Sequence, residues 1–283
     1  MKTILLPFYD DDVSQHAFEL SARLVRPLNG YVEGLFVLRR PPMIDGDSHV
    51  LDESHFALFD EESRRMAAQA RARFETCAAA QGLAIEAPGA SAASEVTAAG
   101  WREIDGVEGQ VVGSHGRLFD LIVVGRGFGH PWLNWLTLVE SALFESGRPV
   151  LLTPQSSAAT CGENVVIAWN SSTETARTIA YGMPLLRQAR SVTIVSVKGW
   201  GVPGPSGEDL AAYLTRSGVA ATARMVDAAG RTPGVTILDE CTRSGADLLL
   251  KGAYTQSRLR QLIFGGATRH ILAQAKIPVL FAN

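Results

Sequence analysis

The chain of 283 residues lacks the features that mark secreted, membrane or disulfide-rich proteins. It has three cysteines, Cys77, Cys161 and Cys241. Their odd number and wide spacing argue against a disulfide framework or a zinc finger. The longest strand-like apolar runs, such as residues 165–169, are far shorter than the roughly 18 to 20 residues of a membrane helix. The N-terminus enters a strand pattern with no signal segment. We therefore expect a cytoplasmic protein with no membrane partner.

Two common nucleotide-binding motifs are missing as well. The four lysines stand at positions 2, 198, 251 and 276, and none has the glycine spacing of a phosphate-binding P-loop. Gly125 and Gly127 lack the third glycine of a dinucleotide fingerprint, because position 130 is histidine. These absences exclude a P-loop NTPase and a Rossmann dehydrogenase.

The composition is that of a globular protein, and the length favours two domains. Hydrophobic residues make up 46% of the chain, which is enough for two cores. The net charge of −3 is the sum of two unequal halves. Residues 1–154 contain 13 Lys and Arg against 21 Asp and Glu, whereas residues 155–283 contain 13 against 8. The basic half can attract a phosphate-bearing ligand, but its excess is too small for a nucleic-acid binder.

An internal repeat divides the chain. Residues 120–125 recur as residues 247–252, with Asp first and Gly last in both copies. Residues 147–152 recur as residues 276–281, each with proline at its third position. These matches occur in the same order, so we interpret them as a tandem duplication. The predicted domains are residues 1–154 and 163–283, joined by a small, polar linker.

Short, nearly continuous apolar runs alternate with helical patterns, as expected for buried strands of parallel sheets. In the second half we predict strands at 164–169, 191–198, 219–227, 247–252 and 277–282, and helices at about 173–189, 206–217, 233–244 and 265–275. In the first half we predict strands near 3–8, 31–38, 96–104, 120–125 and 149–153, a polar insertion around 40–49 and a helix near 56–80. The pattern predicts an α/β protein with two tandem, doubly wound parallel sheets.

The segment after the fourth strand of the second half is the strongest candidate site. In open parallel sheets, ligands bind beyond the carboxyl ends of strands. Gly252 can let a ligand approach the backbone, and Gly265 and Gly266 precede a helix whose N–H groups favour an anion. Charged and hydroxyl side chains lie nearby in sequence: Ser257, Arg258, Arg260, Thr268 and Arg269. The alternative is that the glycines only shape turns and that Thr268 belongs to a helix N-terminus.

This segment, with the strand ending near Asn170 and the closing residues 277–280, resembles a universal stress protein. The whole chain resembles a tandem two-domain member. The resemblance implies the adenine nucleotide alpha hydrolase-like fold and a pseudo-twofold pair of domains associated through their last strands. The family's nucleotide-binding pattern is Gly, two residues, Gly, nine residues, Gly, then Ser or Thr. Gly252 and Gly265 match it, whereas Thr255 and Gly266 replace the second Gly and the Ser or Thr.

The resemblance also implies a ligand and a function. The family's Asp at the end of the first strand is Asn170 here, which can still donate and accept hydrogen bonds. The implied ligand is ATP, with or without Mg²⁺, bound at the C-terminal domain in stress response or signalling rather than turnover. The implied binding residues are Asn170, Gly252, Thr255, Ser257, Arg258, Gly265, Gly266 and Thr268. The first half lacks the corresponding glycine pair and has Glu140 near the phosphate position, so we expect its site to be degenerate.

Other interpretations stay open. A protein of the same fold that lost the nucleotide and binds a protein partner is one alternative, and a slow ATPase is another. A further homodimer beyond the intramolecular pair is also open. Asp10, Asp11 and Asp12 can hold a metal such as Mg²⁺, but helix capping explains them better. Ser114 and His115 lack the spacing of a hydrolase nucleophile motif and fall within a predicted helix or the turn after it. No catalytic residue is predicted.

Overall fold

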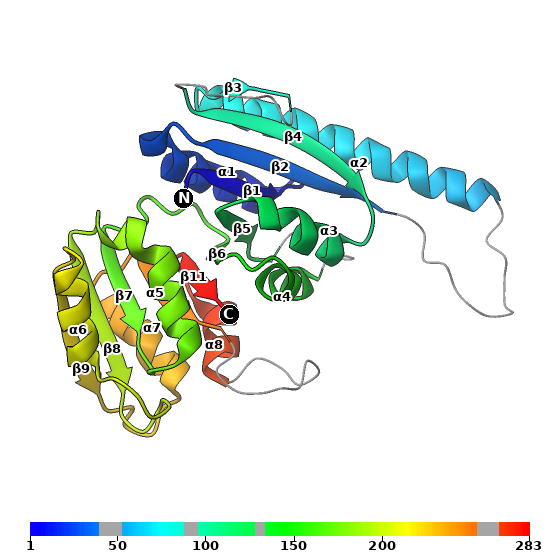
Figure 1. Ribbon diagram of the computed structural model, residues 1–283. Coiled ribbons are helices and arrows are strands. Elements are labelled where there is room, and N and C mark those ends of the chain that lie inside the picture. The colour runs from blue at the N-terminus through cyan, green and yellow to red at the C-terminus, as the bar shows by residue number, and fades with distance from the viewer. Residues whose placement is uncertain (40–52, 88–95, 128–133, 254–265) are drawn as a thin grey trace, which may run out of the picture. The chain divides into compact units, whose positions relative to one another are not determined.

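The computed structural model describes residues 1–39, 53–87, 96–127, 134–253 and 266–283 (Figure 1). It divides into two units, Met1–Arg148 and Pro149–Asn283. The division assigns β6 (Val150–Thr153) to the second unit, although the sequence pattern groups this strand with the first half. The reason is that β6 pairs in antiparallel fashion with β11 (Val279–Ala282).

The N-terminal unit contains a parallel sheet with the strand order β3, β4, β2, β1, β5. The strands are β1 (Thr3–Pro7), β2 (Tyr31–Leu38), β3 (Ala84–Ile85), β4 (Ala98–Asp105) and β5 (Leu121–Gly125). The helices are α1 (Asp12–Val25), α2 (Glu53–Ala80), α3 (Glu108–His115) and α4 (Trp135–Glu145), with short 3-10 turns at Arg26–Leu28 and Gly116–Leu118. The sequence pattern did not predict β3, because this strand has only two residues and both are exposed.

The C-terminal unit has the strand order β6, β11, β10, β7, β8, β9, and all of its pairs except β6 with β11 are parallel. The remaining strands are β7 (Asn164–Ala168), β8 (Ser191–Val197), β9 (Ala221–Val226) and β10 (Leu248–Gly252). The helices are α5 (Thr173–Leu186), α6 (Gly207–Arg216), α7 (Pro233–Arg243) and α8 (Gly266–Gln274). The predicted doubly wound α/β fold is therefore confirmed, with element ends within about three residues.

Aromatic packing fixes α2 on the sheet of the N-terminal unit. Phe74 of α2 contacts Phe8, Phe18 and Trp101, with ring centroids 5.4, 4.9 and 5.4 Å away. A side chain at Gly34 of β2 would place its Cβ 2.5 Å from the Phe74 ring. The glycine therefore provides the space that the phenylalanine fills. Although α2 is long, none of the described helices is apolar enough over such a length to cross a membrane.

An aspartate just before β5 and another just before β10 hold the start of the first strand of each repeat. Asp120 accepts hydrogen bonds from the backbone N–H groups of Lys2 (2.6 Å) and Thr3 (3.1 Å). Asp247 accepts from three successive N–H groups, of residues 162–164, at 2.9 to 3.1 Å. The two aspartates of the sequence repeat thus make equivalent contacts.

A buried carboxylate anchors one face of the N-terminal sheet. The Glu33 side chain on β2 accepts hydrogen bonds from Arg102 (2.8 Å) and Tyr31 (3.1 Å), and lies 2.6 Å from Nε2 of His115. Glu33 is only 2% exposed. Burial by itself raises the pKa of Glu33, but the hydrogen bonds from His115 and Arg102 hold the pKa below its usual value. The cluster connects β2, β4 and α3.

Replacing this carboxylate should destabilise the protein in a pH-dependent way. We expect Glu33→Gln to lower the free energy of unfolding by about 2 kcal/mol at neutral pH, because it weakens the hydrogen bond from the charged Arg102. A depressed carboxyl pKa stabilises the folded state above the unfolded value of 4.5 and ceases to do so as the pH falls through the folded pKa. Urea unfolding should therefore show the difference from wild type shrinking on acidification below that value. A difference that is the same at neutral and acidic pH would contradict the assignment.

Candidate functional site

The carboxyl edge of β7 and β10 forms the candidate site. These two strands are parallel neighbours, with Ala168 beside Lys251, although 83 residues separate the two in sequence. The chain continues from β7 to β8 on one side and from β10 to β11 on the other, so this is the switch point where ligands bind in open α/β sheets. The pairing brings Asn170, Gly252 and the start of α8 to one edge.

Lys251 is the residue at this edge that the sequence analysis did not select. Its side chain lies on the α8 face of the sheet and is only 2% exposed. Nζ donates hydrogen bonds to the carbonyl oxygen of Gly252 (2.8 Å) and to Oγ1 of Thr268 (2.7 Å), and lies 5.9 Å from the centroid of the Trp200 ring. Burial lowers the pKa of Lys251 to about 8, although the charge of Glu174 acts in the opposite direction.

The ammonium group of Lys251 has no carboxylate partner in the described part of the chain. A buried, unpaired charge is costly. The location increases the cost, because Thr268 lies in the first turn of α8 and a helix N-terminus has a partial positive charge. An anion bound at this point would offset both positive charges. The sequence did contain a sign of this, since a lysine ends the apolar run at residues 248–250 where the repeat has Val124.

Asn170 shapes the turn between β7 and α5. Its side chain is 5% exposed, and Oδ1 accepts hydrogen bonds from the Thr175 hydroxyl (2.7 Å) and the Ser172 N–H (3.4 Å). Its carbonyl oxygen accepts from the N–H of Val202 at 3.0 Å. Ser172 in turn caps α5 by accepting from the N–H of Thr175. The amide oxygen of Asn170 is thus already used in holding this turn.

Gly252 is required by the packing of α5. A Cβ at this position would lie 2.4 Å from the backbone nitrogen of Thr175 and 2.6 Å from its hydroxyl oxygen. The space expected to admit a ligand is therefore filled, on this face, by the first turn of α5. On the other face of the sheet, the Lys251 side chain reaches Thr268 of α8.

The remaining predicted binding residues fall into two groups. Gly266 is exposed at the start of α8, with open space around it, and Thr268 is buried beside Lys251. The others lie outside the described residues, namely Thr255, Ser257, Arg258 and Gly265.

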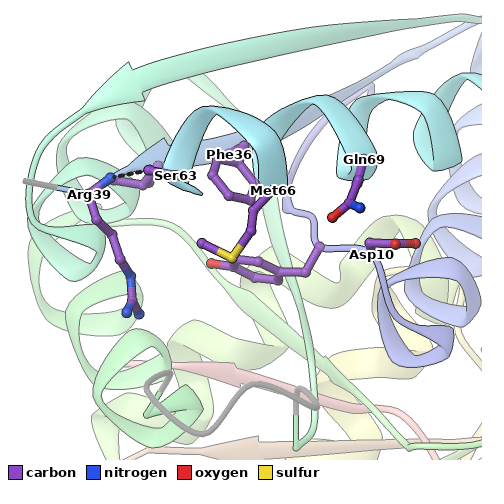
Figure 2. A pocket seen from close by; sticks show the side chains of 8 residues that line it. Asp10, Phe36, Arg39, Ser63, Met66 and Gln69 are labelled. Carbon is purple, nitrogen blue, oxygen red and sulfur yellow. Dashed lines mark hydrogen bonds between the residues drawn. The ribbon is translucent and has the colours of Figure 1, made fainter. Parts of the chain in front are cut away.

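A small pocket lies in the N-terminal unit at the ends of β1 and β2. Figure 2 shows Ser63, Met66 and Gln69 pointing from α2 into it. Its lining residues are Tyr9, Asp10, Phe36, Val37, Arg39, Ser63, Met66 and Gln69. Its volume is about 80 Å³, whereas typical ligand pockets have roughly 300 to 1,000 Å³. The pocket is therefore smaller than a nucleotide requires.

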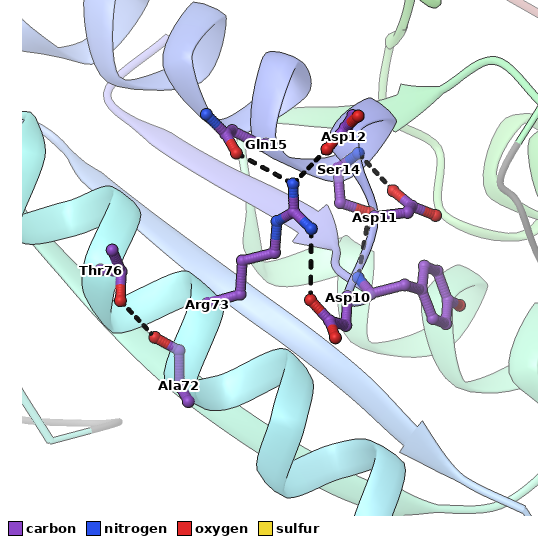
Figure 3. A network of polar contacts seen from close by, with 9 residues as sticks. Asp10, Asp11, Asp12, Ser14, Gln15, Ala72, Arg73 and Thr76 are labelled. Atoms are coloured by element: carbon purple, nitrogen blue, oxygen red, sulfur yellow. Dashed lines mark hydrogen bonds and ion pairs between the residues drawn. The ribbon is translucent and has the colours of Figure 1, made fainter.

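The aspartates after β1 have structural roles (Figure 3). Asp11 caps α1 by accepting the N–H of Ser14 at 2.7 Å, which confirms the capping interpretation. Arg73 of α2 forms ion pairs with Asp10 and Asp12. No group of three potential metal-ligating side chains occurs among the described residues.

The Ser114 and His115 pair has no hydrolase geometry. Both residues end α3, as the sequence indicated. The Ser114 hydroxyl donates to the carbonyl oxygen of Val111 at 3.2 Å, while His115 contacts Glu33. The Ser114 side chain therefore stabilises α3, and the His115 side chain joins α3 to β2.

Comparison with known proteins finds similarity to universal stress proteins. Residues 163–283 match the model of the universal stress protein family. The stress response protein NhaX of Bacillus subtilis (strain 168) is 27% identical over 155 residues, covering 49% of this chain and 92% of NhaX. A universal stress protein of Archaeoglobus fulgidus DSM 4304 has a similar fold, with a TM-score of 0.71 at 16% identity over 100% of this chain and 98% of the other.

Replacing each of the two glycines at the candidate site by alanine should change the stability of the protein to different extents. Gly252→Ala places a methyl group against the backbone of α5, so we expect it to lower the free energy of unfolding by at least about 2 kcal/mol. Gly266→Ala is the matched control, because nothing surrounds that position and alanine favours a helix, so its effect should stay within about 1 kcal/mol. Urea unfolding followed by circular dichroism measures both. Equal effects would contradict the packing described.

The buried lysine should give the protein an unusual pH dependence. A lysine with a depressed pKa destabilises the folded state at neutral pH, and this penalty is relieved as the pH rises from about 8 to the usual 10.5. We expect the free energy of unfolding of the wild type to rise relative to Lys251→Met over this range, by on the order of 2 kcal/mol. Urea unfolding across the range measures this, and parallel curves for the two proteins would refute it.

Proposed function

We propose that the C-terminal unit, whose residues 163–283 match the model of the universal stress protein family, binds an adenine nucleotide, ATP, at the carboxyl edge of β7 and β10. The protein serves stress response or signalling through this binding, without efficient turnover.

The observation that supports the proposal most is the buried ammonium of Lys251, which forms no ion pair with a carboxylate of the described residues. A buried ammonium beside the first turn of α8 provides a full positive charge and a helix N-terminus at the same place. Phosphate groups are the common biological anions that bind such places. The excess of basic residues in this half of the chain favours the approach of a polyphosphate.

The proposal assigns different parts of the ligand to different residues. Lys251, Thr268 and the backbone at Gly266 face the phosphates, while Asn170 lies near the ribose or the base. Thr255, Ser257, Arg258 and Gly265, outside the described residues, complete the phosphate contacts. Gly252 acts indirectly, by allowing α5 to pack against β10.

A specific observation favours a second function, in which the fold is kept and the nucleotide is lost. Asn170 and Gly252 are both explained by the packing of α5, without any ligand. Under this alternative the protein binds a protein partner, and the site residues only stabilise the fold. It leaves unexplained why a lysine is buried there without a carboxylate partner among the described residues, which is why we prefer nucleotide binding.

We also propose that the two units arose by tandem duplication. The equivalent contacts of Asp120 and Asp247 support this origin, as does the similar order of strands in the two units. The β6 and β11 strands, which close the two sequence repeats, pair with each other. An association of last strands is thereby contained within one chain.

Calorimetric titration of the full chain with ATP tests the nucleotide proposal. We expect binding with a Kd below about 1 mM, and a 10- to 100-fold weaker Kd in Lys251→Met, roughly the loss of one hydrogen bond to a charged group. Lys276→Met is the matched control, because this exposed lysine lies at the opposite edge of the same sheet. Its affinity should equal that of the wild type.

A parallel assay of phosphate release checks the statement on turnover, and we expect no release above the background of ATP alone. Absence of ATP binding at millimolar concentration would refute the proposal and support the interaction protein. Equal losses in both lysine variants would show that Lys251 has no particular role.

A further inference from the structure

We propose that Lys251 takes the place of a divalent cation, so that the C-terminal unit binds the metal-free nucleotide rather than its Mg²⁺ complex. This inference rests on the proposed function and specifies the chemical form of the ligand.

The first argument is the charge that the site already provides. A nucleotide polyphosphate needs positive charge close to its oxygens, and proteins supply it with a metal ion, with Lys or Arg, or with a helix N-terminus. Here Lys251 and the first turn of α8 supply two of these three at one point. The ammonium is fixed by Gly252 and Thr268, so binding a phosphate does not require it to be ordered first.

The second argument is the lack of a suitable metal ligand where β7 ends. Mg²⁺ prefers carboxylate oxygens, water and phosphate, in a near-octahedral arrangement. At the end of β7 stands the amide of Asn170, whose Oδ1 already accepts from the Thr175 hydroxyl and the Ser172 N–H. A neutral amide oxygen with two donors is a poor ligand for a hard cation.

The surroundings of Lys251 leave its charge available to the ligand. From α5, Glu174 acts on the ammonium through space and forms no ion pair with it. From α8, Thr268 presents a hydroxyl, while Arg269 is exposed and His270 lies beside Gly234 of α7. The Trp200 ring, which follows β8, has its centroid 5.9 Å from the ammonium.

A proton uptake follows from this arrangement. In the free protein, burial holds the pKa of Lys251 at about 8. A bound polyphosphate favours the charged ammonium and raises this pKa. Binding at about pH 9 therefore takes up close to one proton per nucleotide, and the affinity decreases as the pH rises above 8.

Calorimetric titration of the full chain with ATP, in excess EDTA and in excess MgCl₂, tests the inference. We expect a Kd in EDTA equal to or lower than the Kd in MgCl₂. Titrations near pH 9 in buffers of different ionisation enthalpy should show the uptake of close to one proton in the wild type and none in Lys251→Met. A purely structural lysine would not give this proton signal.

A reciprocal variant adds a carboxylate near the ribose or the base of the ligand. In Asn170→Asp the new carboxylate repels the free polyphosphate through space, so the Kd in EDTA should rise by up to about tenfold, and Mg²⁺ bound to the polyphosphate should reduce this loss. Asn164→Asp is the matched control, because Asn164 begins the same strand at the opposite edge. Its affinity should not change under either condition. Circular dichroism confirms that each variant is folded before it is titrated.

The possible outcomes separate this inference from the proposed function. ATP binding that is abolished by EDTA overturns the inference and leaves the proposed function intact. Metal-independent binding without proton uptake also overturns the inference. So does metal-independent binding with the same affinity in Lys251→Met, because another group then holds the phosphates. No binding under either condition refutes the proposed function itself, and the inference with it.

Discussion

The parallel pairing of β7 with β10 is the constraint on which the candidate site depends. Backbone hydrogen bonds hold these two strands in register, and Asp247 fixes the start of β7 beside the start of β10. The register places Asn170 and Gly252 at the same edge of the sheet. It also makes successive residues of β10 face opposite helices, because side chains alternate along a strand. Leu250 therefore contacts α5 at Gly182, whereas Lys251 reaches α8.

The residues on the α5 face and on the α8 face of this edge need different explanations. On the α5 face, Gly252 has no side chain because the first turn of the helix occupies the space, and Asn170 and Ser172 hold that turn in place. Close packing explains all of these residues. On the α8 face, packing explains little, because it has placed a charged group in an apolar interior beside the positive end of a helix. A buried charge that destabilises the fold is typical of functional sites.

The two units differ at this point although their folds correspond. At the position of Lys251 the N-terminal repeat has Val124, which is fully buried in β5. Two charged clusters of the N-terminal unit are paired internally, Glu33 with Arg102 and Arg73 with two aspartates. The contrast between Val124 and Lys251 supports placing the proposed ligand site in the C-terminal unit.

The sequence alone determined the fold class and nearly all of the elements, because apolar runs and helical periods are local properties of the chain. It also determined that Asp120 and Asp247 correspond, and that the edge after β10 is the candidate site. It did not determine that residues 150–153 join the second unit, since this depends on pairing with a strand about 130 residues later. Nor did it identify Lys251, because the burial of a side chain and the absence of a counter-charge depend on elements distant in sequence. Only the tertiary structure, by bringing Thr268 of α8 to Lys251 of β10, shows a buried ammonium beside the first turn of a helix, with no carboxylate partner among the described residues.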